Sequence, residues 1–171
     1  MPQINLAGGP HGTTTTDEGT ADETRYWPYP RGDSLRLLQR AFFIITHNIY
    51  KKNVACNRYF RHLAGGRSFD DVWDDATIWI NYEPRVGLGW DGATDQTGGK
   101  EITIGEAAFQ KKNVWYVVGV LVHELAHANG AGGPPSRAAA EALKHCGLNA
   151  LYDGAIGVTP SAAKDDDERI V

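Results

Sequence analysis

Two histidines and a glutamate stand at a fixed spacing in the apolar stretch VVGVLVHELAHANG, residues 117–130. His123 and His127 are four residues apart, so on a helix they share one face, with β-carbons about 5–6 Å apart. Two imidazoles placed in this way can converge on one metal ion. Glu124 is rotated by about 100° around the helix axis, which lets its carboxylate hold a metal-bound water without becoming a ligand. The spacing therefore predicts two metal ligands and a separate general base.

The helix that must carry these side chains has almost no polar face, so we expect it to be buried on most sides. Asn113 is the expected N-cap, and Gly130 is expected to end the helix. Burying three ionisable groups in such a helix costs several kcal/mol unless they are paired, and zinc is the simplest partner. The alternative is an accidental match in a structural helix bundle, which predicts no stoichiometric metal.

The sequence HELAH, residues 123–127, has every fixed position of the HExxH signature, and in this respect the chain resembles the zincin metallopeptidases. The resemblance implies that His123 and His127 ligate Zn²⁺ and that Glu124 is the general base of a hydrolase that cuts amide bonds. The order of a strand, EITIG, followed by a buried helix is also similar to the zincin arrangement, in which an edge strand lines the substrate cleft. A protein or peptide is the implied substrate.

The third ligand has to come from outside HELAH. The metzincin continuation HExxHxxGxxH is absent, because Gly133 occupies the position of its last histidine. A second helix, RAAAEALKHCGLNALY, is expected after Ser136 as its N-cap. If it packs antiparallel to the first helix, a rise of about 1.5 Å per residue brings Glu141 level with the histidine pair, whereas His145 lies about 6 Å further on.

Glu141 is therefore the favoured third ligand and His145 the alternative. A glutamate from a following helix resembles the gluzincin pattern, although the 13 residues between His127 and Glu141 are fewer than in thermolysin-like members. His145 could instead support a ligand or donate a hydrogen bond to the oxyanion of the reaction, and Tyr152 could do the same.

Around this site the sequence predicts an α+β fold of the zincin type, in which a small strand layer packs on the HExxH helix and the following ligand helix. The layer would consist of a strand at residues 77–82 and the strand EITIG, separated by a long glycine-rich loop. A first helix is expected from an N-cap at Asp33 or Ser34, and a short helical turn from a cap at Ser68.

Three segments are expected along the chain: a flexible arm over residues 1–30, a catalytic domain over residues 31–160 and an acidic tail over residues 161–171. Cys56 and Cys146 are expected to be two buried free thiols rather than a disulfide. The 171 residues carry a net charge of −4, which does not favour nucleic acid as a partner. We expect no membrane span and no cleavable signal, hence a cytoplasmic protein or one exported without such a signal.

The layout resembles the metallopeptidase domains of bacterial toxins and effectors, which implies action on a protein or on peptidoglycan cross-links. A different class of function is a non-catalytic, zinc-stabilised binding module, in which the same site would recognise a partner without cutting it.

Overall fold

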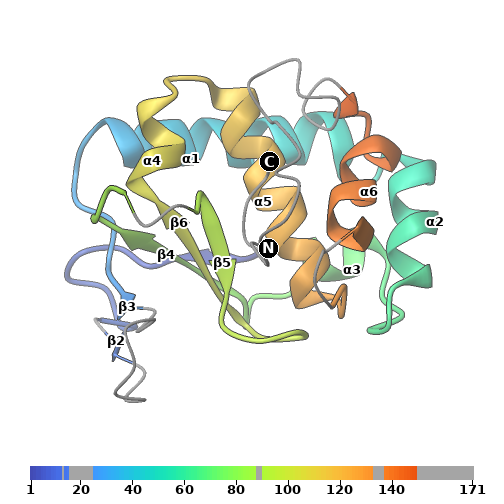
Figure 1. The fold of residues 1–171 in the computed structure, drawn as a ribbon, viewed down its shortest axis with the longest axis horizontal. Coiled ribbons are helices and arrows are strands. Elements are labelled where there is room, and N and C mark those ends of the chain that lie inside the picture. Colours follow the sequence, from blue (N-terminus) through green and yellow to red (C-terminus); the bar gives the residue numbers. More distant parts are fainter. Residues whose placement is uncertain (13, 16–24, 88–89, 133–136, 150–171) are drawn as a thin grey trace.

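The computed structural model describes residues 1–12, 14–15, 25–87, 90–132 and 137–149. These residues form an α+β fold in which the helices lie above and to the right of a small mixed sheet in Figure 1, in agreement with the coarse α+β class that was predicted. No helix in this part of the chain is long and apolar enough to span a membrane.

The main sheet has four strands in the order β1–β4–β6–β5. The parallel strands are β1 (Gln3–Ile4), β4 (Trp79–Glu83) and β6 (Glu101–Gly105), whereas β5 (Gly92–Thr94) runs antiparallel to β6. The isoleucines of β4 and β6 are fully buried and belong to the same core as the apolar residues of the helices. A second, two-stranded sheet pairs β2 (Thr14–Thr15) with β3 (Arg25–Tyr26).

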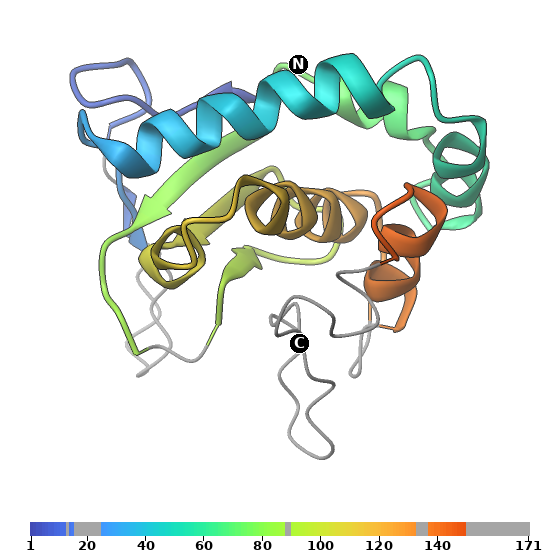
Figure 2. The ribbon, with the colours of Figure 1, turned by 90° about the horizontal axis from the view of Figure 1, so that it is seen from above.

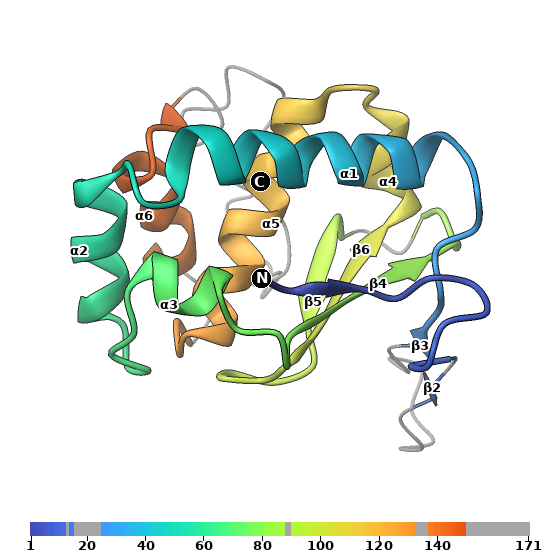
Figure 3. The same cartoon turned by 180° about the vertical axis from the view of Figure 1, so that it is seen from behind.

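The helices are α1 (Asp33–Ile44), which continues as the π-helix η1 (Ile45–Ile49), α2 (Val54–His62), α3 (Phe69–Trp73), α4 (Glu106–Gln110), α5 (Val114–Ala128) and α6 (Arg137–His145). Helix α5 contacts α1, α6, β5 and β6. Seen from above, it lies between α1 and β5 (Figure 2), and the view from behind shows α1 crossing it (Figure 3). The helix that carries HELAH is thus the centre of the fold.

The predicted limits of α5 are confirmed. The side chain of Asn113 accepts a hydrogen bond from Trp115 N at 3.0 Å, and twelve of the fifteen helical residues are buried. At the other end Gly130 has a φ of 86°, in the left-handed region that favours glycine. The amide of Ala131 then bonds back to the carbonyl of Ala126 at 2.9 Å, which is a Schellman turn.

Of the other local predictions, the cap at Ser68 and the strand EITIG are confirmed, and the cap of α1 is wrong. Ser68 caps α3 as predicted, and EITIG is strand β6. The expected cap of α1 by Asp33 or Ser34 is wrong, because α1 begins at Asp33 after Gly32 without a side-chain cap. Ser34 instead donates to Glu106 Oε2 at 2.9 Å.

The edge strand next to α5 is β5, which lies inside the segment predicted to be a long loop, and β6 is an inner strand. In the described part of this segment the strand has three residues, and they are stabilised by pairing with Ile102–Ile104 rather than by their own β propensity.

Residues 1–12 and 25–30, which were expected to belong to a flexible arm, pair with the main sheet and with each other in this structure. Strand β1 adds to the edge of β4, and the side chains of Asn5 and Tyr29 are buried. The pairing of β1 with β4 joins residues 76 positions apart (Gln3 with Trp79), so local composition gives no sign of it. The predicted acidic tail, residues 161–171, lies outside the described residues.

The prediction of two free thiols is also wrong, because Cys56 and Cys146 form a disulfide across 90 positions of sequence. It joins α2 to the turn that follows α6. Helix α6 is shorter than predicted and ends at His145, because Gly147, with a φ of 84°, begins a second Schellman turn.

Candidate metal centre

His123 and His127 lie side by side in the last two turns of α5, as their spacing predicts. Their Nε2 atoms are 3.2 Å apart, and their ring planes are inclined at 66°. Two imidazole ligands of a tetrahedral zinc ion, each bound at about 2.0–2.1 Å, have nitrogens about 3.3 Å apart. The two side chains therefore have the separation of a chelating pair.

The ring of His127 is held by the turn that ends α5. Its Nδ1 lies 2.7 Å from the carbonyl oxygen of Ala131. Because a carbonyl only accepts hydrogen bonds, Nδ1 is the nitrogen that carries the proton, which leaves the lone pair of Nε2 on the side of His123. A hydrogen bond of this kind fixes the ring orientation of metal-ligating histidines.

Glu124 is 1% exposed and lies against strand β5. The hydroxyl of Thr94 donates to its Oε2 at 2.9 Å and also contacts its backbone carbonyl at 3.2 Å. An ideal β-carbon on Gly92 would stand 2.9 Å from Glu124 Oε1 and 2.7 Å from Val120 Cγ1. The absence of a side chain at Gly92 therefore lets the strand approach the carboxylate closely.

The segment that carries β5 is attached to both halves of α5. Near the start of the helix the hydroxyl of Tyr116 donates to Asp91 Oδ2, and near its end the amide of Gly98 donates to His127 O at 2.9 Å. Burial, with the hydrogen bond to Asp91 and its charge, raises the pKa of Tyr116 well above its ordinary value. The neutral phenol is thus kept as a donor, and β5 is held parallel to the helix.

The residues Gly92, Thr94 and Ala131 were not identified from the sequence. Gly92 stands in a glycine-rich segment where no single glycine is distinguished, and Ala131 contributes only a backbone carbonyl. Their involvement depends on which segment folds onto α5, and no pattern within either segment indicates it.

The structure does not bring Glu141 to the histidine pair. Glu141 is paired with Lys144, with 3.3 Å between Oε1 and Nζ, and both side chains are 38% exposed. The buried side of α6 consists instead of Ala139, Ala142 and Leu143. In the described residues no group of three His, Cys, Asp or Glu side chains is arranged to hold a metal ion.

His145 stacks on Tyr59 of α2, with ring centroids 4.3 Å apart. The hydroxyl of Tyr59 donates to Ala138 O at 2.8 Å, and burial together with the charge of Glu141 raises the pKa of Tyr59. His145 thus belongs to the contact between α6 and α2. Tyr152, the other predicted oxyanion donor, lies outside the described residues.

A comparison with known proteins found no matching family model, no matching curated protein and no matching solved structure. The case for any family therefore depends on the HELAH residues and on the geometry around them.

Proposed function

We propose that the protein is a zinc-dependent metallopeptidase with a zincin-like arrangement of its site. The observation that carries the proposal is the pairing of His123 and His127, whose Nε2 atoms are 3.2 Å apart beside the buried carboxylate of Glu124. His123 and Glu124 are buried and His127 is partly buried, and the carboxylate of Glu124 and the ring of His127 are both held by hydrogen bonds to neighbouring segments.

His123 and His127 would hold the zinc ion, and Glu141 is the third ligand that we propose, although its carboxylate is paired with Lys144 in this structure. When bound, zinc supplies a Lewis acid that polarises a carbonyl and lowers the pKa of water to about 7. Two neutral imidazoles and one carboxylate form a ligand set known for catalytic zinc, and it leaves a fourth position open for water or substrate.

Glu124 is the proposed general base. It takes a proton from the attacking water as the new C–O bond forms at the amide carbon, and it gives that proton to the departing nitrogen as the C–N bond breaks. Thr94 holds Oε2 of this carboxylate, and Gly92 leaves room for Oε1, so the carboxylate is fixed by contacts to the protein. The products are a carboxylic acid and an amine.

The test combines metal analysis with turnover of a peptide library by the wild type and by Glu124→Gln. The expected result is one zinc per chain in both proteins and turnover in the wild type alone. Zinc without turnover in the wild type would indicate the binding module instead. Absence of stoichiometric zinc, in protein shown to be folded by circular dichroism, would mean that HELAH is an accidental match.

The disulfide between Cys56 and Cys146 favours the exported alternative over the cytoplasmic one, because structural disulfides persist in oxidising compartments. We therefore propose a protein, a peptide or a peptidoglycan cross-link outside the cytosol as the substrate, as for a toxin or effector. Thiol counting on protein isolated from its native compartment under alkylating conditions tests this. Detection of two free thiols would instead favour a cytoplasmic location.

A further inference from the structure

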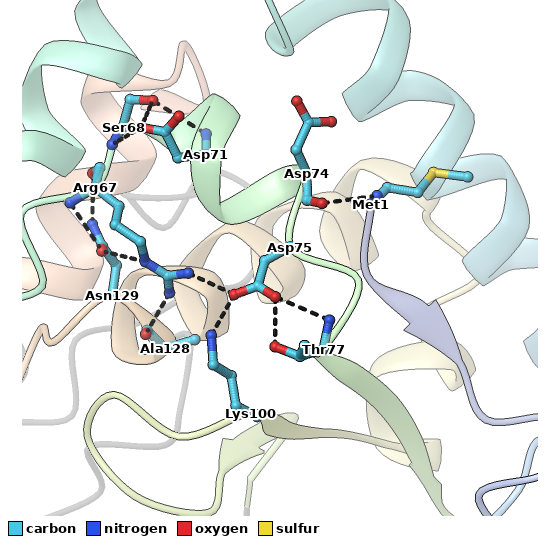
Figure 4. Close-up of polar contacts among 10 residues, drawn as sticks. All are labelled: Met1, Arg67, Ser68, Asp71, Asp74, Asp75, Thr77, Lys100, Ala128 and Asn129. Carbon is cyan, nitrogen blue, oxygen red and sulfur yellow. Dashed lines mark hydrogen bonds and ion pairs between the residues drawn. The ribbon is translucent and has the colours of Figure 1, made fainter.

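At the end of α5, Ala128 and Asn129 belong to a polar network with Arg67, Asp75 and Lys100 (Figure 4). In this network Arg67 links Asn129 and Ala128 to Asp75, which is also paired with Lys100. The network contains no candidate zinc ligand, and the mechanism proposed above does not use it.

Asn129 is fully buried at the residue that closes α5. Its Nδ2 donates to the carbonyls of Phe60 at 2.8 Å and Arg67 at 2.9 Å, and its Oδ1 lies 3.4 Å from both N and Nε of Arg67. Its own carbonyl accepts from Gly65 N at 2.9 Å. The end of the helix is therefore bonded through one residue to the connection between α2 and α3.

Space for this contact is left by two glycines. An ideal β-carbon on Gly65 would stand 2.6 Å from Oδ1 of Asn129, and one on Gly130 would stand 2.7 Å from Gly65 N. The two backbones thus approach each other as closely as glycine permits, which fixes the turn that contains Gly130.

The guanidinium of Arg67 lies at the carboxyl end of α5. One nitrogen donates to the carbonyl of Ala128 at 3.2 Å, and another donates to Asp75 Oδ2 at 2.6 Å. The last carbonyls of a helix have no partner within the helix, and a cation is favourable there. Arg67 therefore satisfies both the helix end and the carboxylate behind it.

Asp75 is in turn held by Lys100 on Oδ2 and by the amide and hydroxyl of Thr77 on Oδ1, at 2.9 Å and 2.5 Å. Burial alone would raise its pKa, but the hydrogen bonds from Lys100, Thr77 and Arg67 outweigh that effect and hold the pKa well below its ordinary value. The carboxylate is charged at neutral pH and fixes the direction of the guanidinium.

We infer that Arg67 and Asn129 are positioning residues for the candidate metal centre, an inference that rests on the function proposed above. They fix the turn from Asn129 to Ala131, and the carbonyl of Ala131 holds the ring of His127 through Nδ1. Loosening the network would leave the fold in place but free the ring to change its tautomer and direction. Substitution of a group that orients a metal ligand in this way typically lowers metal affinity by about 10–100-fold.

The experiment compares Arg67→Gln with Arg85→Gln. Arg85 also pairs with a buried carboxylate, Glu83, at 2.8 Å, but at the opposite end of β4 from Asp75, so it controls for the loss of an ion pair as such. Two quantities are measured in each folded variant: the zinc dissociation constant by chelator competition, and the tautomer of His127 in zinc-free protein from long-range ¹H–¹⁵N spectra.

Arg67→Gln should weaken zinc binding about 10–100-fold and replace the single Nδ1–H tautomer of His127 by a mixture, whereas Arg85→Gln should change neither. Wild-type affinity and an unchanged tautomer in Arg67→Gln would overturn the inference while leaving the proposed function intact. A wild type that binds no zinc, but whose tautomer depends on Arg67, would overturn the function and retain the positioning role.

If Arg67→Gln does not fold, Arg67→Lys decides the question. Lysine keeps the charge beside Asp75 but cannot bond Ala128, Asn129 and Asp75 with one planar group. A folded Arg67→Lys protein with wild-type zinc affinity and tautomer would contradict the inference, and weaker binding with a mixed tautomer would support it.

Discussion

A β-carbon placed on Gly92 would lie 2.9 Å from Oε1 of Glu124, so strand β5 runs directly against the carboxylate proposed to act as base. The glycine is needed for space, since it is the neighbouring atoms of Val120 and Glu124 that exclude a side chain. This contact joins the edge of the sheet to the reacting group and gives a direct way to perturb it.

Gly92→Ala should therefore displace the carboxylate of Glu124 or the strand. We expect overpacking to lower the free energy of unfolding by about 1–3 kcal/mol and to reduce kcat, with one zinc still bound. Denaturant unfolding and steady-state kinetics measure the two effects. Gly32→Ala is the matched control, because a β-carbon there meets no atom within 4 Å. Equal kcat for Gly92→Ala and the wild type would contradict the proposed position of the base.

Glu141→Gln tests the predicted third ligand. If Glu141 binds zinc, the substitution should lower zinc affinity by more than the roughly 10–100-fold typical of a group that only supports a ligand. His145→Gln should have little effect, since His145 stacks on Tyr59. Isothermal titration or chelator competition measures both.

Lys144→Met sharpens this test because Lys144 and zinc would compete for the same carboxylate. An exposed ion pair contributes up to about 1 kcal/mol, so its removal should tighten zinc binding by up to about fivefold. Unchanged affinity in both Glu141→Gln and Lys144→Met would exclude Glu141 and direct the search to another residue.

The depressed pKa of Asp75 predicts a loss of stability in acid. A carboxylate whose pKa is lower in the folded than in the unfolded protein contributes stability that is fully present above the unfolded value of about 3.9 and is lost as the pH falls towards the folded value. Asp75→Asn should therefore be less stable than the wild type at pH 7, and the difference should shrink below about pH 4.

Urea unfolding at pH 7 and pH 3 measures this dependence. Asp33→Asn is the control, because the pair of Asp33 with Arg36 is largely exposed and should contribute little at either pH. A difference between wild type and Asp75→Asn that does not change with pH would show that the carboxylate is not the group responsible.

Reduction of the disulfide should destabilise the protein strongly, because Cys56 and Cys146 close a loop of 90 positions. Loop-closure entropy gives a contribution of roughly 4–5 kcal/mol for a loop of this length. Denaturant unfolding with and without a reducing agent measures it, and the double variant Cys56→Ala/Cys146→Ala, which should be insensitive to the reducing agent, is the control. A wild type whose stability does not depend on the reducing agent would contradict the prediction.

Helix α5 and the placement of its two histidines on one face could be predicted from the sequence because the information is local. The N-cap at Asn113, the apolar residues, the spacing of His123 and His127 and the stop at Gly130 all lie within 18 consecutive residues. Helical geometry alone then places two imidazoles on one face. The same holds for the cap at Ser68 and for strand β6, whose residues carry their own signals.

The surroundings of that helix were decided by tertiary structure, since they depend on contacts between distant segments. The sequences GGPHG and GLGWDGATD do not indicate their tertiary contacts. The first follows strand β1, which pairs with β4, and the second contains strand β5, which lies against Glu124. The disulfide and the network from Arg67 to Asn129 likewise depend on contacts between distant segments. A sequence states which side chains are available, but burial and hydrogen bonding between remote segments select the ones that hold His127 and Glu124 in place.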